Sequence, residues 1–158
     1  MAESKLDEKD LEILRILSTD AKLTTKEVAK RIQSPVSTAF SRIKRLEKEG
    51  VIKRYVALLD PKRLQRGTVA FILVSFTTQG QGPLSQREVA DKIKEFAEVQ
   101  EVHIITGDWD ILLKVRISDV EELGRFVVDK LRSVKGINKT VTSLVLATEK
   151  EEPAVLPT

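Results

Sequence analysis

Apolar residues recur every three or four positions through the first fifty residues, and this spacing predicts amphipathic helices. Asp7 precedes the first apolar series and Asp10 follows three residues later, so the pair is expected to cap a helix that continues to about Leu17. Thr24 and Glu27 form a similar capping box before a second, shorter helix that ends near position 33. Only a short turn separates this helix from the next apolar series, which predicts a helix-turn-helix.

The third helix is expected to begin at Ser34 and Pro35, because serine caps helix N-termini and proline suits the first helical position. Gly50 should end this helix as a C′ glycine. Residues 51–59 have a β-like pattern that ends in a turn at 60–61. The predicted inward face of the third helix consists of four apolar residues at helical spacing, which are Val36, Phe40, Ile43 and Leu46.

The second half of the chain alternates β-like and helical patterns. Strands are predicted over 68–78, 99–106, 111–117 and 138–148, with a loop at Gly80-Gln81-Gly82-Pro83 and a tight turn at 107–110. Ser85 with Glu88, and Ser118 with Glu121, are expected to cap the two intervening helices. The β-α-β, β-α-β order is that of a ferredoxin-like sandwich. The predicted inward residues of the two helices are Val89, Ile93 and Phe96, and Val120, Leu123, Val127, Leu131 and Val134.

The strand over 69–76 is apolar on both faces. Ala70, Ile72, Val74 and Phe76 alternate with Val69, Phe71 and Leu73. Two helices cover only one face of a four-stranded sheet, so the other face needs a second apolar surface. We therefore expect a homodimer in which two sheets pack face to face.

Charge is distributed unevenly along the 158 residues. The formal net charge is +3, but residues 1–66 hold 16 Lys and Arg against 10 Asp and Glu, and the remainder holds 11 against 14. A basic part joined to a mildly acidic one is typical of a polyanion-binding module attached to another domain, although ordinary solvated helices also carry such charges. There is no cysteine, which excludes disulfides, thiolate zinc sites and cysteine nucleophiles. No targeting segment and no apolar run near the ~20 residues of a membrane span is found, so we expect a soluble, cytoplasmic protein.

No group of residues indicates an enzyme. His103 is isolated within a predicted strand and is expected to be structural, because no acid or nucleophile is spaced to work with it. Asp108 and Asp110 lack a third metal ligand. Gly80-Gln81-Gly82-Pro83 matches no phosphate-binding fingerprint. We expect neither catalysis nor a metal or other cofactor.

Four segments together resemble the Lrp/AsnC family of prokaryotic transcription regulators, also called leucine-responsive or feast/famine regulators; archaeal members look similar. They are LDEKDLEILRIL (6–17), TTKEVAKRI (24–32), SRIKRLEKEGVIKRYVALLDPKRL (41–64) and VQEVHIITGDWDILLKV (99–115). The resemblance implies an α+β fold, with an N-terminal winged helix-turn-helix and a C-terminal ferredoxin-like βαββαβ sandwich. We expect residues 1–66 to form the DNA-binding domain with a linker strand, 67–150 the dimerisation and effector domain, and 151–158 a frayed tail.

The resemblance makes the third helix the expected reader of double-stranded DNA. The family commonly has a Gly-hydrophobic-Ser turn before this helix, whereas this chain has Gln33-Ser34-Pro35, which leaves the first-turn contacts open. The β-like segment after the helix is expected to contact the DNA backbone as a wing through Lys53, Arg54, Lys62 and Arg63. The expected DNA-binding residues are Ser34, Ser37, Thr38, Ser41, Arg42, Lys44, Arg45, Lys48 and Arg54.

The resemblance also implies a pocket for a free amino acid as effector, at contacts between subunits of a homodimer or of a tetramer or octamer. Carboxylates in the 106–110 turn suit an ammonium group and backbone N–H groups suit a carboxylate. The spacing alone favours a plain hairpin connection, and it is the resemblance that favours a ligand site. Trp109 could instead lie at a dimer contact. The expected effector-binding residues are Thr106, Gly107, Asp108, Trp109 and Asp110, with Ser143, Leu144 and Val145 on the last strand.

Two further functions are considered. Ferredoxin-like sheets also bind RNA, but they do so through stacking aromatics, and this chain is only 4% aromatic. The other is an amino-acid sensor that acts through protein partners without DNA. The sequence does not identify the amino acid, the operators, or whether the regulator activates or represses.

Overall fold

The computed structural model describes residues 5–77, 85–152 and 157. The chain divides into two compact units, one formed by residues 1–58 with 150–158 and the other by residues 59–149. The C-terminal residues therefore belong to the first unit, where the carbonyl of Pro157 accepts a hydrogen bond from Arg15 Nε at 3.2 Å. The predicted loop at 80–83 lies outside the described residues. In the described part, no helix is long and apolar enough to cross a membrane.

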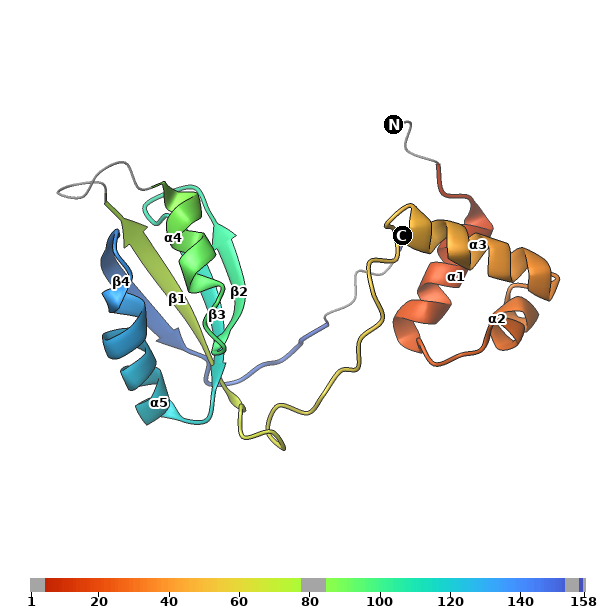
Figure 1. Cartoon of the computed structure of the whole chain (residues 1–158). Helices are drawn as coiled ribbons and strands as arrows, with labels where there is room; N and C mark the ends of the chain where they lie inside the picture. Colours follow the sequence, from red (N-terminus) through yellow and green to blue (C-terminus); the bar gives the residue numbers. More distant parts are fainter. Residues whose placement is uncertain (1–4, 78–84, 153–156, 158) are drawn as a thin grey trace. The chain divides into compact units, whose positions relative to one another are not determined.

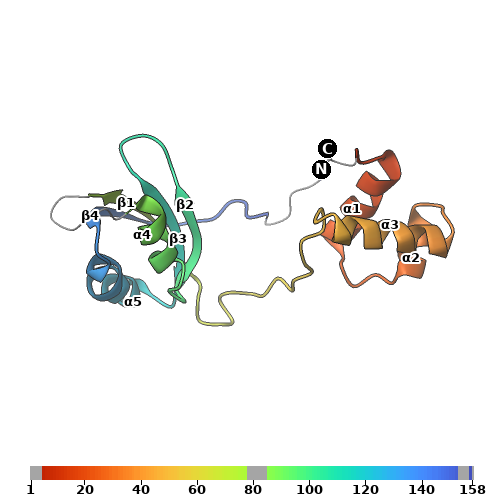
Figure 2. The ribbon, with the colours of Figure 1, turned by 45° about the horizontal axis from the view of Figure 1, so that its top comes forward.

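The first unit contains three helices, α1 (Glu8–Thr19), α2 (Thr25–Arg31) and α3 (Val36–Lys48), shown in Figures 1 and 2. The two predicted capping boxes are confirmed, because the side chain of Asp7 accepts from the backbone of Asp10, that of Thr24 from the backbone of Glu27, and both bonds are reciprocated. The helices share one apolar core made of Ile13, Val28, Ala29, Ile32, Ala39, Ile43 and Leu46.

The start of α3 differs from the prediction. Pro35 is the N-cap residue rather than the first helical residue, and no side chain caps the helix. Ser34 instead donates its hydroxyl to the carbonyl of Ile32 at 3.2 Å and accepts from Lys9 Nζ at 2.9 Å. Gln33 has a φ of 49°, so the chain turns through a left-handed residue before Ser34. The hydroxyl therefore closes the turn after α2 and is not available to cap α3.

The predicted inward face of α3 is partly wrong. Val36 and Phe40 are 48% and 53% exposed, whereas Ala39, Ile43 and Leu46 are buried. Ala39, Ile43 and Leu46 also lie at helical spacing, so the packed face is rotated toward the small alanine. Alanine has little apolar surface, and for this reason the pattern favoured the larger neighbours.

Residues 51–59, predicted as β-like, form no strand, although Ile52 packs against the helical core. A strand requires a partner for its backbone groups, and the described residues of the first unit include no strand. Five apolar side chains of this segment are instead exposed, namely Val51, Tyr55, Val56, Leu58 and Leu59.

The second unit contains one antiparallel sheet in the order β2-β3-β1-β4, the order of a ferredoxin-like sandwich. Figure 2 shows the hairpin of β2 and β3. The elements, which confirm the predicted order, are β1 (Thr68–Phe76), α4 (Gln86–Ile93), β2 (Val99–Ile104), β3 (Ile111–Ile117), α5 (Val120–Arg125), a π-helical turn η1 (Phe126–Lys130), a 3₁₀ turn η2 (Leu131–Ser133) and β4 (Ile137–Leu144).

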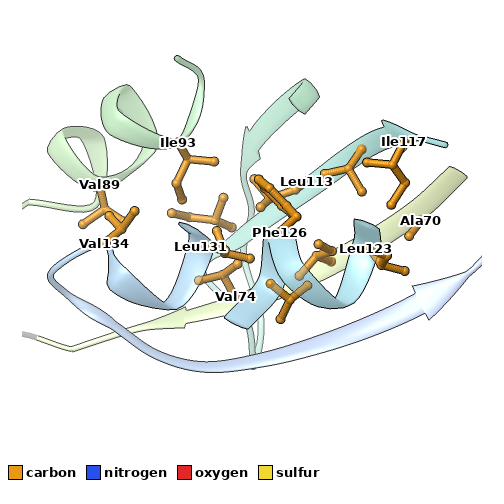
Figure 3. Close-up of a cluster of buried hydrophobic side chains, with 14 residues drawn as sticks. Ala70, Val74, Val89, Ile93, Leu113, Ile117, Leu123, Phe126, Leu131 and Val134 are labelled. Atoms are coloured by element: carbon orange, nitrogen blue, oxygen red, sulfur yellow. The ribbon is translucent and has the colours of Figure 1, made fainter. Parts of the chain in front are cut away.

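Both helices of this unit pack on the same face of the sheet. Figure 3 shows side chains of both helices gathered over the strands, with Val89 of α4 beside Val134 and Leu123 of α5 beside Ala70. The capping box of Ser85 and Glu88 is confirmed. Gly136, which precedes β4, has a φ of 96°, and a Cβ there would lie 3.0 Å from Cγ2 of Val89.

The predicted inward residues Leu123, Val127, Leu131 and Val134 are buried, but the start of α5 differs from the prediction. Asp119, not Ser118, is the N-cap and accepts from the backbone of Glu122. Val120 is 61% exposed, whereas Phe126, which was not predicted inward, is 1% exposed. The π-helical turn makes a wider turn than an α-helix, which lets the consecutive residues Phe126 and Val127 both lie in the core.

No helix among the described residues of the second unit packs on the other face of the sheet. Across it, Phe71 pairs with Lys114 and Leu73 with Leu112, and Val141 lies opposite Leu73 on the other side. Phe71 and Val141 are 39% and 45% exposed. Glu101 also lies on this face and accepts hydrogen bonds from His103 and Lys114, which lower the pKa of Glu101, the bond from His103 most of all. We call this surface the open sheet face.

Candidate functional site: the exposed face of the third helix and the turn at Trp109

The exposed side of α3 is basic and hydroxyl-rich. Ser37, Ser41, Lys44 and Lys48 are all exposed, on the side away from the buried seam of the helix. Helical spacing brings these four residues onto one face. Such a face combines short donors and acceptors with cationic groups, which are the groups that contact base edges and phosphates.

Glu47 is an acidic residue of α3, and its carboxylate is bonded within the unit. It accepts from Lys44 Nζ at 2.7 Å and from the Tyr55 hydroxyl at 3.0 Å. These two hydrogen bonds lower the pKa of Glu47, the bond from Lys44 more strongly. Burial, together with the bond to Glu47, raises the pKa of Tyr55 to about 12. Tyr55 therefore holds the segment after α3 against the helix.

Arg42 and Arg45, which were predicted to face DNA, are bound to α1. Arg42 Nη1 lies 2.6 Å from a carboxylate oxygen of Asp7 and 2.9 Å from one of Asp10, and Arg45 Nη2 lies 2.5 Å from the other oxygen of Asp10. The Asp10 side chain is completely buried, while those of Arg42 and Arg45 are 25% and 37% exposed. We call these four residues the Asp10 ion-pair cluster.

The electrostatics of the cluster favour the charged form of both carboxyl groups. Burial acts to raise the pKa of Asp10, but hydrogen bonds from Arg45, from the Asp7 backbone and from Arg42 outweigh it, and the pKa is lowered. The pKa of Asp7 is also lowered, chiefly by the hydrogen bond from Arg42. Sequence reasoning assigned Asp10 a capping role only. Its position four residues after Leu6 and three before Ile13 places a carboxylate within an apolar series, which is the signal that it is buried.

The remaining predicted DNA-binding residues lie on α3 and on the segments that follow it. Thr38 is half-buried, and its carbonyl accepts from the Ser41 hydroxyl at 3.0 Å. Lys53 and Arg54 are exposed on the segment that follows α3. Lys62 and Arg63 are exposed too, but they lie in the second unit.

The turn at 106–110 joins β2 to β3. Gly107 has a φ of 112°, a conformation that favours glycine. Asp110 is bonded to its own fold: its carboxylate accepts from the backbone N–H of Phe76 at 2.7 Å and from Gln86 Nε2 at 2.6 Å. Asp108 is exposed and Trp109 is half-buried. Asp110 thus anchors the turn, and Asp108 is the carboxylate that faces solvent.

The turn lies beside the first half of β4, not the second. A hollow beside Trp109 is lined by Arg132 and by Ile137, Asn138, Lys139, Thr140 and Val141. The backbone N–H of Asp110 donates to the carbonyl of Val74, whereas Ser143 and Leu144 pair with Phe71 and Ala70. Val145 bonds to Val69. These offsets along β1 correspond to about 10 Å or more, so the structure of one chain does not bring 143–145 to the turn. Arg132 was not predicted, because it lies within a predicted helix, in η2, and no motif includes it.

Comparison with known proteins identifies the two units. Residues 6–53 match the model of a winged helix-turn-helix DNA-binding domain, and residues 69–155 match that of the Lrp/AsnC ligand binding domain. An uncharacterised HTH-type transcriptional regulator of Pyrococcus horikoshii is 42% identical over 147 residues, which cover 93% of this chain and 97% of that protein. The regulator FL11 of the same organism is 39% identical over 92% of this chain and 93% of its own length.

Solved structures agree with these matches. The crystal structure of a Neisseria meningitidis transcriptional regulator in complex with L-Met has a TM-score of 0.88, is 32% identical, and covers 96% of both chains. Together the matches confirm the predicted helix-turn-helix and ferredoxin-like architecture. The chain belongs to the Lrp/AsnC family of DNA-binding transcriptional regulators, a family that is not a class of enzymes.

Proposed function

We propose that α3 enters the major groove of double-stranded DNA and presents Ser37, Ser41, Lys44 and Lys48 to it. The observation that carries this proposal is the exposed face of α3, on which hydroxyl and ammonium groups are gathered. Thr38 at its margin, and Lys53 and Arg54 after the helix, are proposed to contact phosphates beside the groove. A regulator of this kind would act in the cytoplasm, where its DNA is accessible.

Arg42 and Arg45 receive a different role in this proposal. Their guanidinium groups neutralise Asp7 and Asp10, so they hold α1 against α3. They are therefore proposed to position the recognition helix, and Ser34 to fix the turn before it through Lys9.

The salt dependence of DNA binding tests this assignment. Each phosphate contact that is lost reduces the slope of log K against log salt by about 0.9. Lys48→Ala should lower the slope by about one such step, because its side chain extends from the exposed face. Lys92→Ala on α4 is the matched control and should leave the slope unchanged. An identical slope in wild type and Lys48→Ala would contradict the proposed contact, whereas absence of binding by the wild type at low salt would contradict DNA recognition itself.

We further propose that the chain forms a homodimer through the open sheet face, and that dimers associate into tetramers or octamers. Phe71 and Val141 are exposed on that face beside Leu73 and Leu112, and a second copy would cover this apolar surface. Sedimentation equilibrium tests it. Val141→Asp should shift the protein toward monomer, and Val128→Asp, whose site is 60% exposed on the helical side, is the control. A wild-type monomer at micromolar concentration would contradict the dimer.

The effector is proposed to be a free amino acid bound at the hollow beside Trp109. Arg132 on its wall can pair with a carboxylate, and the solvent-facing Asp108 of the same turn can accept from an ammonium group. The related Neisseria regulator was solved with L-Met, which supports this class of ligand. Thr106 and Gly107 shape the turn, and Asp110 anchors it. The strand residues would contribute to the effector site only if assembly of several chains brings them near the turn, and these are Ser143, Leu144 and Val145.

Trp109 is the one tryptophan of the chain, so its emission reports on this site. Each of the twenty amino acids is titrated while emission and sedimentation are followed. We expect at least one to change both, since a ligand alters assembly only when it binds one assembly state more tightly than the other. Arg132→Gln should weaken that response. No response to any amino acid would contradict the effector proposal and leave the DNA-binding proposal standing.

A further inference from the structure

Two apolar side chains stand on the exposed side of the recognition helix. Val36 is the first residue of α3 and Phe40 follows four residues later, so the two lie next to each other on the helix surface. They are 48% and 53% exposed, and neither belongs to the buried core of the first unit. Two exposed apolar side chains next to each other on one helix form a small apolar patch that a binding partner can cover.

These side chains are continuous with the polar face of the helix. Ser37 follows Val36 directly, and Lys44 follows Phe40 by one turn. The Lys44 ammonium lies 6.0 Å from the centre of the Phe40 ring, which places a cation beside the aromatic face. The apolar pair therefore adjoins a surface suited to DNA, at the N-terminal half of the helix, the part that reaches base edges in helix-turn-helix proteins.

The edges of base pairs in the major groove offer a single apolar group. Guanine, cytosine and adenine present hydrogen-bond donors and acceptors there, and only thymine adds a C5-methyl group. An apolar side chain that enters the groove can gain by burying that methyl, whereas opposite cytosine it meets a polar edge. Val36 and Phe40 thus fit thymine methyls better than any other feature of the groove.

We infer that Val36 and Phe40 are specificity-determining residues that read thymine methyl groups at two neighbouring positions of each half-site. The inference rests on the DNA-binding role of α3. The two side chains distinguish thymine from the other bases by apolar contact. The Lys44 ammonium interacts with both the Phe40 ring and a phosphate of the DNA backbone. Sequence preference at these positions therefore comes from methyl burial and not from a hydrogen bond.

Replacing thymine by deoxyuridine, which removes only the methyl, tests the inference. A preferred site is first selected from random duplexes with the full-length protein, and each thymine of one half-site is then exchanged singly. For the wild type, one or two exchanges should weaken binding by about fourfold each, the loss expected for one buried methyl. In Phe40→Ala or Val36→Ala the matching exchange should have no effect, because the contact is already absent. Phe40→Leu should retain part of it.

The control is Val128→Ala, which removes an exposed valine from the second unit and should preserve the full effect of every exchange. Equal sensitivity to deoxyuridine in wild type and in both alanine variants would overturn the inference. The inference would also be overturned if Phe40→Ala dissociated the protein into smaller species while binding stayed equally sensitive to loss of the thymine methyl. Phe40 would then be a contact between copies of the chain. If the wild type selects no duplex at all, the DNA-binding role fails, and this outcome is distinct from a selected site without methyl sensitivity.

Discussion

Replacing Asp10 by asparagine isolates the contribution of the Asp10 ion-pair cluster. The buried carboxylate accepts from Arg42 at 2.9 Å, from Arg45 at 2.5 Å and from the Asp7 backbone at 3.1 Å. Asparagine keeps one oxygen but turns an NH₂ donor toward a guanidinium group. A hydrogen bond to a charged group is worth about 1.5–3 kcal/mol, and removing one member of a buried ion pair costs about 3–5 kcal/mol. Both arginines are partly exposed and regain water, so we expect a loss of about 2–4 kcal/mol.

Urea denaturation followed by circular dichroism at 222 nm measures this loss. Trp109 lies in the second unit, so its emission serves as an internal reference that should move less. Glu121→Gln, which removes the exposed pair with Arg125, is the control and should change stability little. A loss of less than about 1 kcal/mol in the free energy of unfolding of Asp10→Asn would refute the reasoning. The buried cluster would then contribute no more than an ordinary exposed ion pair.

The pH dependence has a defined sign. The folded-state pKa of Asp10 is lowered, so its stabilisation is present above the ordinary aspartate value of about 3.9 and is lost as the pH falls through the folded-state value. The difference between wild type and Asp10→Asn should be constant from pH 5 to 8 and shrink below about pH 4. The same variant removes a buried negative charge beside Arg42 and Arg45, so it should bind non-specific DNA more tightly. A large loss of non-specific affinity would instead show that Asp10 orients Arg42 and Arg45 toward phosphates.

Other substitutions test the packing and charge of the two units. Gly136→Ala should destabilise by about 2–3 kcal/mol in thermal melts, because alanine is strained at a φ of 96° and its methyl collides with α4. Gly124→Ala, whose Cβ would meet nothing within 4 Å in α5, should stabilise by about 0.5–1 kcal/mol; equal effects would contradict both arguments. Glu98→Gln removes a nearly buried carboxylate bonded to Lys130 at 2.5 Å. Burial acts to raise the pKa of Glu98, but the hydrogen bond and positive charge of Lys130, together with a backbone hydrogen bond, outweigh it and the pKa is lowered. The destabilisation caused by Glu98→Gln should therefore be largest above about pH 4.5 and fade below it, as measured in acid titrations of stability. Lys44→Ala should reduce the salt slope of DNA binding, checked by fluorescence anisotropy.

Local signals were sufficient for most of the element boundaries. The capping boxes at Asp7, Thr24 and Ser85 each involve residues three positions apart, and these interactions need no tertiary context. Strand β3, predicted over 111–117, is observed over Ile111–Ile117, because alternate burial on a central strand leaves a clear pattern. The order of elements followed from these signals, and it fixed the topology.

The errors arose where the decisive partner is distant or inconspicuous. Residues 51–59 have the composition of a strand, but the described residues of the first unit include no strand that could pair with them. The inward face of α3 was partly misassigned because the small side chain of Ala39 adds less to a hydrophobicity pattern than the large side chain of Phe40 does. Arg42 and Arg45 were assigned to DNA because their partner Asp10 is more than thirty residues earlier in the chain, and a helix pattern does not reveal such a pairing.

The cluster also explains how a short helix can hold a defined orientation. The buried seam of α3 is narrow, since Ala39, Ile43 and Leu46 span about a sixth of the helix circumference. A seam this narrow restrains rotation about the helix axis only weakly. A small rotation would bury a side chain at one edge while exposing one at the other edge, with little change in free energy. Arg42 and Arg45 lie on one flank of the seam and are fixed to Asp10, so rotation would break charged hydrogen bonds. The ion pairs therefore determine which side chains face outward, and a buried pair that adds little net stability can still be required for recognition.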